Sequence, residues 1–314
     1  MNKPSPHLVP DPAHGAHDQG KSHFVTSHDG LRIHVREYGE RTTPGVPVVC
    51  LPGLARTTAD FDELAPVLAA GPPQRHVVAI DLRGRGHSDH DADHANYNCT
   101  VELADIVSVL FTLGVGPAIF VGSSRGGVLT MMLATVHPTA IAGVVLHDVG
   151  PVTEAHGVAR LRGYLGKLPH PHTFEEGAEI LRRLLGAQFP KLTEEQWLAG
   201  ARRAWHPKHG GLKPAYDLGI ARALSGIDIE LPIPTLWHEF DALGEVPMLV
   251  IRGANSDILS AATVAAMRER RAQMEAIEVP DQGHAPLLEG ELVQQIARFV
   301  HTCEETRGDT PAAH

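Results

Sequence analysis

A serine at position 124 stands at a junction that limits the possible folds more than any other feature of the chain. Residues 118–121 form a short apolar run and residues 125–136 have helical character, with Gly122-Ser123-Ser124-Arg125-Gly126 at the turn between them. A Gly-x-Ser-x-Gly pentapeptide can occur by chance, but this strand–turn–helix context makes it specific. The sharp turn leaves no room for Cβ atoms at Gly122 and Gly126 and forces a strained backbone at Ser124. We expect the hydroxyl of Ser124, rather than that of Ser123, to stand above a sheet as a nucleophile.

The chain before this junction opens with a hairpin and then alternates strands with helices. Asp29-Gly30 separates two strand patterns, which is typical of a hairpin turn. The later strand runs lack polar alternation, which favours a parallel sheet covered on both faces. Thr100 is the expected N-cap of its helix. Strands are predicted at 24–27, 31–38, 46–51, 76–80, 118–121 and 141–146, and helices at 58–69, 100–113 and 125–136.

The alternation stops near residue 150 and resumes near residue 246. Between these points the chain shows helix after helix, separated by proline and glycine, with no strand pattern. An insertion between two strands of such a sheet would cover its C-terminal edge, where open α/β sheets bind ligands. The best helices of this insertion are 174–185, 193–204 and 216–224; beyond it we predict strands at 246–252 and 274–279 and helices at 261–270 and 287–301.

A serine hydroxyl needs a base to take its proton and an acid to orient that base. His284 follows the last strand in a Gly-His loop, a suitable place for a catalytic imidazole. Asp257 follows the strand at 246–252 and is the favoured acid; Asp148, which follows the strand at 141–146, is the alternative. Asp281 is too close to His284 along the chain to orient it.

Two backbone N–H groups should stabilise the oxyanion that forms when the serine attacks. One belongs to Arg125, directly after the nucleophile at the positive end of its helix. The other is expected from Leu54 in the loop Pro52-Gly53-Leu54 that follows the strand at 46–51.

Composition excludes several other classes of protein. The net charge of −10 is spread along the chain without a clustered basic face, which argues against a nucleic acid partner. No apolar run approaches the roughly 20 residues of a membrane span, and residues 1–21 lack the apolar core of a secretory signal. Three widely spaced cysteines favour reduced thiols and a cytoplasmic location. The 21 histidines show no metal-binding spacing, so we expect neither a metal nor an organic cofactor. No feature bears on the oligomeric state.

The motifs together resemble the α/β-hydrolase fold superfamily, in its capped group of esterases, enol-lactonases, carbon–carbon bond hydrolases and cofactor-free haloperoxidases. Residues 81–88 (Asp-Leu-Arg-Gly-Arg-Gly-His-Ser) belong to this pattern as a loop whose Arg83 and Arg85 we interpret as structural, with substrate contact as the alternative. Many relatives have His-Gly where this chain has Pro52-Gly53. A serine at the elbow argues against dehalogenase and epoxide hydrolase activity, which use aspartate there. The matching segments are 51–54, 81–88, 122–127, 148–151, 253–257 and 283–284.

The resemblance implies a mostly parallel eight-stranded sheet with helices on both faces and a helical cap inserted after the sixth strand. The implied domains are a disordered leader (1–22), a core (23–150 and 244–303), a cap (151–243) and a frayed tail (304–314). The implied activity is hydrolysis of small-molecule carboxylic esters through an acyl-enzyme. A lactonase or carbon–carbon bond hydrolase is the alternative, and a non-catalytic ligand-binding protein is a third, less favoured hypothesis. The cap also offers apolar and aromatic candidates for substrate contact, although core packing is the more frequent role of such residues: Tyr164, Leu165, Phe174, Trp197, Trp205 and Trp237.

Overall fold

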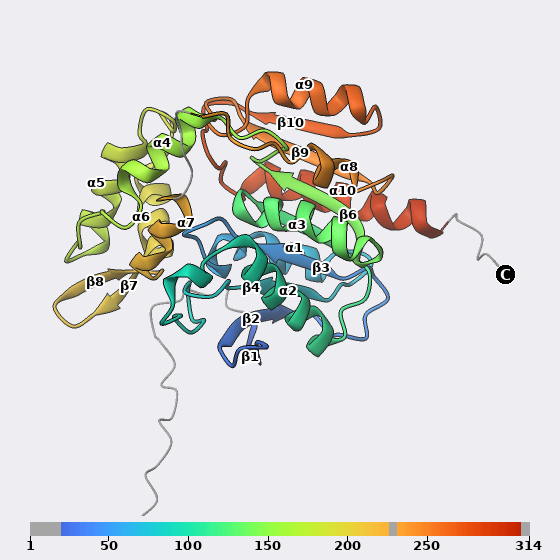
Figure 1. The fold of residues 1–314 in the computed structure, drawn as a ribbon, viewed down its shortest axis with the longest axis horizontal. Coiled ribbons are helices and arrows are strands. Elements are labelled where there is room, and N and C mark those ends of the chain that lie inside the picture. The colour runs from blue at the N-terminus through green and yellow to red at the C-terminus, as the bar shows by residue number, and fades with distance from the viewer. Residues whose placement is uncertain (1–19, 226–230, 309–314) are drawn as a thin grey trace, which may run out of the picture.

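An eight-stranded sheet forms the centre of the protein (Figure 1). In this computed structural model, which describes residues 20–225 and 231–308, the strand order is β1-β2-β4-β3-β5-β6-β9-β10. Strand β2 is antiparallel to both of its neighbours and all other neighbouring pairs are parallel, which confirms the predicted sheet. The strands are β1 (Lys21–Thr26), β2 (Arg32–Tyr38), β3 (Val48–Leu51), β4 (Val77–Ile80), β5 (Ala118–Ser123), β6 (Ile141–His147), β9 (Met248–Gly253) and β10 (Glu275–Val279).

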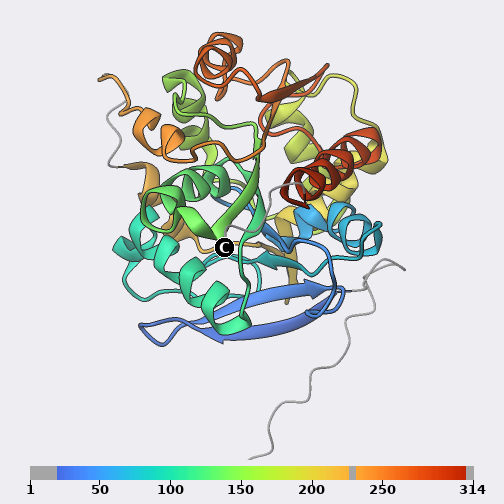
Figure 2. The same cartoon turned by 90° about the vertical axis from the view of Figure 1, so that its right-hand side faces the viewer.

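The central strands are buried on both faces, as apolar runs without polar alternation require. In β3, Val49 and Leu51 pack into one apolar cluster while Val48 and Cys50 pack into the other. Helices α2, α3, α8 and α9 supply the first cluster, and α1 and α10 supply the second, so the two sets lie on opposite sides of the sheet (Figure 2). These helices are α1 (Leu64–Ala70), α2 (Cys99–Leu113), α3 (Arg125–Val136), α8 (Trp237–Asp241), α9 (Ala261–Arg270) and α10 (Gly290–Gly308).

Two helix starts differ from the sequence prediction. Helix α2 is capped by Asn98, whose side chain accepts the Val101 N–H at 3.0 Å, and not by Thr100. The helix expected at 58–69 is divided into a short 3₁₀ helix, η1 (Thr58–Phe61), and α1. Pro66 falls in the first turn of α1, where an N–H would have no helical acceptor, so it does not weaken the helix.

The ordered chain extends further at both ends than expected. Lys21 and Ser22, assigned to the leader, form the start of β1, and α10 continues through the first part of the predicted tail to Gly308. Residues 1–19 and 309–314, which carry the rest of these two predictions, lie outside the described residues. Within the described ranges, no helix has both the length and the apolar character that crossing a bilayer requires.

Residues 155–225, here called the insertion, form a lobe beside the sheet (Figure 1). Its hairpin of β7 and β8 was not predicted, because the strands are short and interrupted by proline. The register leaves His209 and Gly210 as a two-residue turn, and Gly210 has the positive φ (83°) that such turns require. The insertion comprises α4 (Ala155–Tyr164), α5 (Phe174–Leu185), α6 (Glu194–Ala204), β7 (Trp205–Lys208), β8 (Gly211–Pro214), η4 (Leu218–Ala221) and α7 (Arg222–Ser225).

Helix α8 lies within the segment expected to be cap, but it packs with the sheet. Phe240 and Leu243 are buried in the same apolar cluster as α2 and α3. Trp237, a candidate for substrate contact, instead packs against this cluster, and the Arg270 guanidinium lies 4.2 Å from its ring centre. The chain therefore returns to the core before β9 begins.

Candidate active site

Ser124 lies at the sharp turn between β5 and α3 that the sequence predicts. Its backbone has φ 48° and ψ −111°, an uncommon conformation for a residue with a side chain. A Cβ on Gly122 would lie 2.6 Å from Gly127 Cα, and one on Gly126 would lie 2.1 Å from the Leu51 carbonyl oxygen. Both contacts are impossible, which confirms why only glycine fits on either side of the turn.

His284 reaches Ser124 from the loop after β10. The His284 Nε2 atom lies 2.9 Å from Ser124 Oγ, and its Nδ1 atom lies 2.7 Å from Asp148 Oδ2. The Asp148 side chain has no exposed surface and that of His284 is 7% exposed, so water competes little for the hydrogen bond between them. A serine hydroxyl, an imidazole and a carboxylate are thus connected in series, although they are far apart in the sequence.

The acid favoured from the sequence, Asp257, is not the residue that contacts His284. Its carboxylate instead forms a bidentate ion pair with Arg160 of α4, at 2.5 Å from Nε and 2.8 Å from Nη2. Burial opposes ionisation there, but the Arg160 hydrogen bonds hold the pKa of Asp257 below its usual value. The sequence placed both aspartates after a strand, and only the tertiary structure distinguishes the one that faces the imidazole.

Asp148 is held by three hydrogen-bond donors from different segments. Its Oδ1 accepts the Gly253 N–H at 2.8 Å, and its Oδ2 accepts the Ser256 hydroxyl at 2.6 Å in addition to His284. Asp148 also has positive φ (52°), which turns its side chain away from the course of β6. A buried carboxylate needs such partners to remain charged.

The loop after β3 lies beside Ser124. An ideal Cβ on Gly53 would be 3.7 Å from Ser124 Cβ, so the loop approaches the serine closely. The Arg85 Nε donates to the Leu54 carbonyl oxygen at 2.8 Å, which fixes the orientation of the Leu54 residue. Arg83 and Arg85 are fully buried and neither lines the cavity described below, as expected for structural residues.

Glu102 was missed by sequence reasoning, although it connects the two expected oxyanion donors. This fully buried carboxylate pairs with Arg85 at 2.7 Å and accepts a hydrogen bond from Arg125 Nε at 2.7 Å. Arg85 in turn holds Leu54, and Arg125 directly follows Ser124. An acidic residue inside α2 gives no local indication of this role, because its partners come from two other loops.

A second buried histidine, His147, directly precedes Asp148. His147 Nδ1 is 2.9 Å from Ser123 Oγ, so the hydroxyl of Ser123 contacts this ring and not His284. Burial lowers the pKa of His147 to about 4, although the charge of Asp148 opposes this shift. His147 is therefore neutral near pH 7.

This depressed pKa makes the stability of the protein depend on pH. Between about pH 6.5 and pH 4 the unfolded chain binds a proton at His147 and the folded chain does not, so the free energy of unfolding falls as pH falls. Between pH 7 and pH 4.5, we expect the free energy of unfolding to fall by about 2–3 kcal/mol less in His147→Asn than in the wild type. Urea unfolding at both pH values measures it, with the exposed His209→Asn as control. An unchanged pH dependence in His147→Asn would contradict the assignment.

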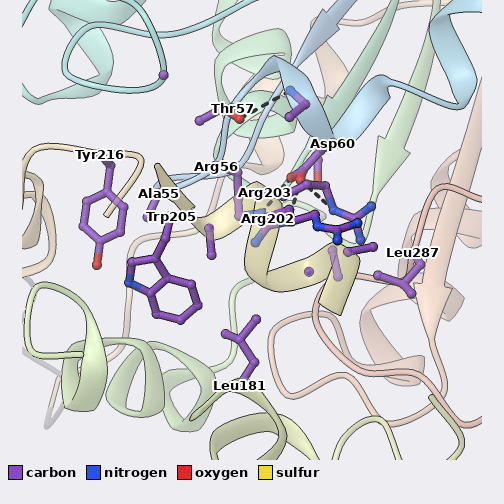
Figure 3. A pocket seen from close by; sticks show the side chains of 18 of the residues that line it. Ala55, Arg56, Thr57, Asp60, Leu181, Arg202, Arg203, Trp205, Tyr216 and Leu287 are labelled. Atoms are coloured by element: carbon purple, nitrogen blue, oxygen red, sulfur yellow. Dashed lines mark hydrogen bonds and ion pairs between the residues drawn. The ribbon is translucent and has the colours of Figure 1, made fainter. Parts of the chain in front are cut away.

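A cavity of about 790 Å³ lies between the sheet and the insertion. Ser124 and His284 line it from the core, and α4, α5 and α6 supply much of the opposite wall. In Figure 3, Leu181, Trp205 and Tyr216 lie across the cavity from a group of charged side chains. Five of the six candidates for substrate contact line it: Tyr164, Leu165, Phe174, Trp197 and Trp205.

Comparison with known proteins agrees with this architecture. The chain is 36% identical to the 3-hydroxybutyrate-oligomer hydrolase of Cupriavidus necator over 81% of this chain and 87% of that protein. It is 26% identical to the 2-(acetamidomethylene)succinate hydrolase of Mesorhizobium japonicum over 86% of this chain and 92% of that protein.

A solved structure has the same fold. The crystal structure of an alpha/beta hydrolase from Novosphingobium aromaticivorans is 38% identical and covers 90% of this chain and 98% of its own, with a TM-score of 0.82. The sequence pattern of the alpha/beta hydrolase family matches residues 48–296, which include Ser124, Asp148 and His284. The chain is therefore a hydrolase and belongs to the alpha/beta hydrolase family.

Proposed function

We propose that this protein hydrolyses carboxylic esters, with Ser124 as nucleophile, His284 as general base and Asp148 as the acid that orients it. The observation that carries the proposal is the hydrogen-bonded series from Ser124 Oγ through His284 to Asp148. In such a series the carboxylate fixes the tautomer of the imidazole, which leaves Nε2 free to take the serine proton.

The proposed reaction has two halves. Ser124 Oγ attacks the ester carbonyl while His284 Nε2 accepts its proton, and the Leu54 and Arg125 N–H groups stabilise the oxyanion. His284 then gives the proton to the departing alkoxide, which leaves an acyl group on Ser124. Water attacks this acyl-enzyme with His284 again as base, and the carboxylic acid and free serine are released.

We further propose that the substrates are short oligoesters of hydroxy acids. The 36% identical relative is named for hydrolysis of 3-hydroxybutyrate oligomers, and the cavity is large enough for more than one such unit. Lactone or carbon–carbon bond hydrolysis by the same three residues is the alternative, because substrate choice depends on the residues around the cavity and not on the fold. The free thiols of Cys50, Cys99 and Cys303 support a cytoplasmic location.

A fluorophosphonate label and a substrate panel test the proposed chemistry. We expect the label to attach to Ser124, and p-nitrophenyl esters of increasing chain length to be hydrolysed faster than a lactone or a vinylogous diketone. A protein that only binds ligands would show neither labelling nor turnover. Faster cleavage of the lactone or the diketone would favour the alternative reactions.

A further inference from the structure

Three arginines meet on one side of the cavity. Arg56 belongs to the loop after β3, and Arg202 and Arg203 occupy the last turn of α6. Figure 3 shows them grouped around Asp60, with Trp205 and Tyr216 on the other side. We call Arg56, Arg202 and Arg203 the arginine cluster.

Two members of the arginine cluster, Arg56 and Arg203, share a single carboxylate. Asp60 forms a bidentate pair with Arg56, at 2.7 Å and 2.5 Å, and lies 3.8 Å from Arg203 Nε. Among the described residues, no carboxylate is close enough to Arg202 to form an ion pair. Three other carboxylates that line the cavity have partners outside the cluster: Asp62 pairs with Arg36, Asp81 with His34, and Glu289 with Gln196.

The cluster begins close to the nucleophile. An ideal Cβ on Gly53 would lie 3.1 Å from Arg56 Cγ and 3.7 Å from Ser124 Cβ, so these two side chains flank the same glycine. Asp60 is also close enough for its charge to act on His147, beside Asp148. The positive charge therefore lies where a short substrate bound at Ser124 would extend.

We propose that the arginine cluster binds a free carboxylate on the substrate, so that the preferred esters are short and anionic. This inference rests on the proposed ester hydrolysis and names the feature that selects among esters. Guanidinium groups bind carboxylates in bidentate geometry, and a partly buried site strengthens the interaction. Asp60 holds Arg56 in place, so the guanidinium N–H groups of Arg202 and Arg203 are available to bind the substrate carboxylate. The apolar wall with Leu181 and Trp205 receives the hydrocarbon part.

A purely structural role for two of these residues makes a different prediction. Basic side chains in the last turn of a helix stabilise its negative end, and Arg202 and Arg203 are so placed in α6. In that role they would affect every substrate alike. The decisive measurement is therefore the ratio of the kcat/KM values for two substrates that share one scissile ester and differ in the charge of the terminal group.

The dimer of 3-hydroxybutyrate with a free carboxylate and its neutral N-methylamide form such a pair, because both contain the same scissile ester. We expect the protein to cleave the acid with a kcat/KM about 10- to 100-fold higher than the amide. In the double variant Arg202→Gln/Arg203→Gln this ratio should fall to within about threefold of one, because hydrogen bonds to the carboxylate are lost. The matched control is Arg183→Gln on α5, whose arginine pairs with Glu179 and does not line the cavity; its ratio should stay at the wild-type value.

Two results would overturn the inference: a wild-type ratio near one, or a double variant in which kcat/KM falls equally for both dimers and the ratio persists. The second result would assign the arginines to the stability of α6. If the protein does not hydrolyse esters, neither dimer and no p-nitrophenyl ester is turned over. That outcome would contradict both the proposed function and this inference, and it differs from the two results above.

Discussion

Replacing Ser124 with alanine should lower kcat/KM for p-nitrophenyl butyrate by about 10⁴-fold or more, because no other group can form the acyl-enzyme. The remaining residues would retain the cavity and the proposed oxyanion donors, so any residual rate would come from water attacking the bound ester. Steady-state kinetics with purified protein, with and without a fluorophosphonate label, measure the effect.

The fold should survive this substitution. Alanine, like serine, carries a Cβ, so the strained backbone at φ 48° costs both residues a similar free energy. Circular dichroism and the midpoint of thermal unfolding should match the wild type. Ser123→Ala is the matched control: it removes the hydrogen bond to His147 but leaves Ser124 in place, so most of the activity should remain. An active Ser124→Ala variant would refute the assignment of the nucleophile.

The elbow was predictable because its chemistry is local. The apolar strand, the two glycines that exclude a Cβ and the helix that follows are all contiguous in sequence, and each has a physical reason to be there. The parallel sheet was predictable for a similar reason, since β3 to β6 are apolar on both faces. The place of His284 beside Ser124 was also predictable, because this histidine follows the last strand of the sheet.

The orienting acid was not predictable in this way. Asp148 and Asp257 both follow strands that meet at the same edge of the sheet, so strand position alone permits either. The choice depends on Ser256 and Gly253, which donate to Asp148, and on Arg160 of the insertion, which engages Asp257. Such contacts join segments about 100 residues apart. The β7–β8 hairpin and the return of α8 to the core also depend on tertiary packing.

The second large effect expected is that of Asp148→Asn, which should reduce kcat/KM for ester hydrolysis by about 10³- to 10⁴-fold. An amide can donate a hydrogen bond to His284 Nδ1, which would favour the tautomer that carries its proton on Nε2 and cannot accept the serine proton. Asparagine also lacks the negative charge that stabilises the imidazolium formed during attack. Because the side chains have nearly the same shape, steady-state kinetics and thermal unfolding together separate loss of activity from loss of fold.

Asp257→Asn is the matched comparison, and we expect it to change kcat/KM by less than about tenfold. It breaks the ion pair with Arg160 and so weakens the contact between α4 and the loop after β9, but it leaves the three partners of Asp148 untouched. The Arg160 charge, with its side chain 19% exposed, loses its partner, so stability should fall by about 1–3 kcal/mol. A large loss of activity in Asp257→Asn with an active Asp148→Asn variant would restore Asp257, the acid favoured from the sequence. The opposite result would establish that the acid at the end of β6 orients His284 in this protein.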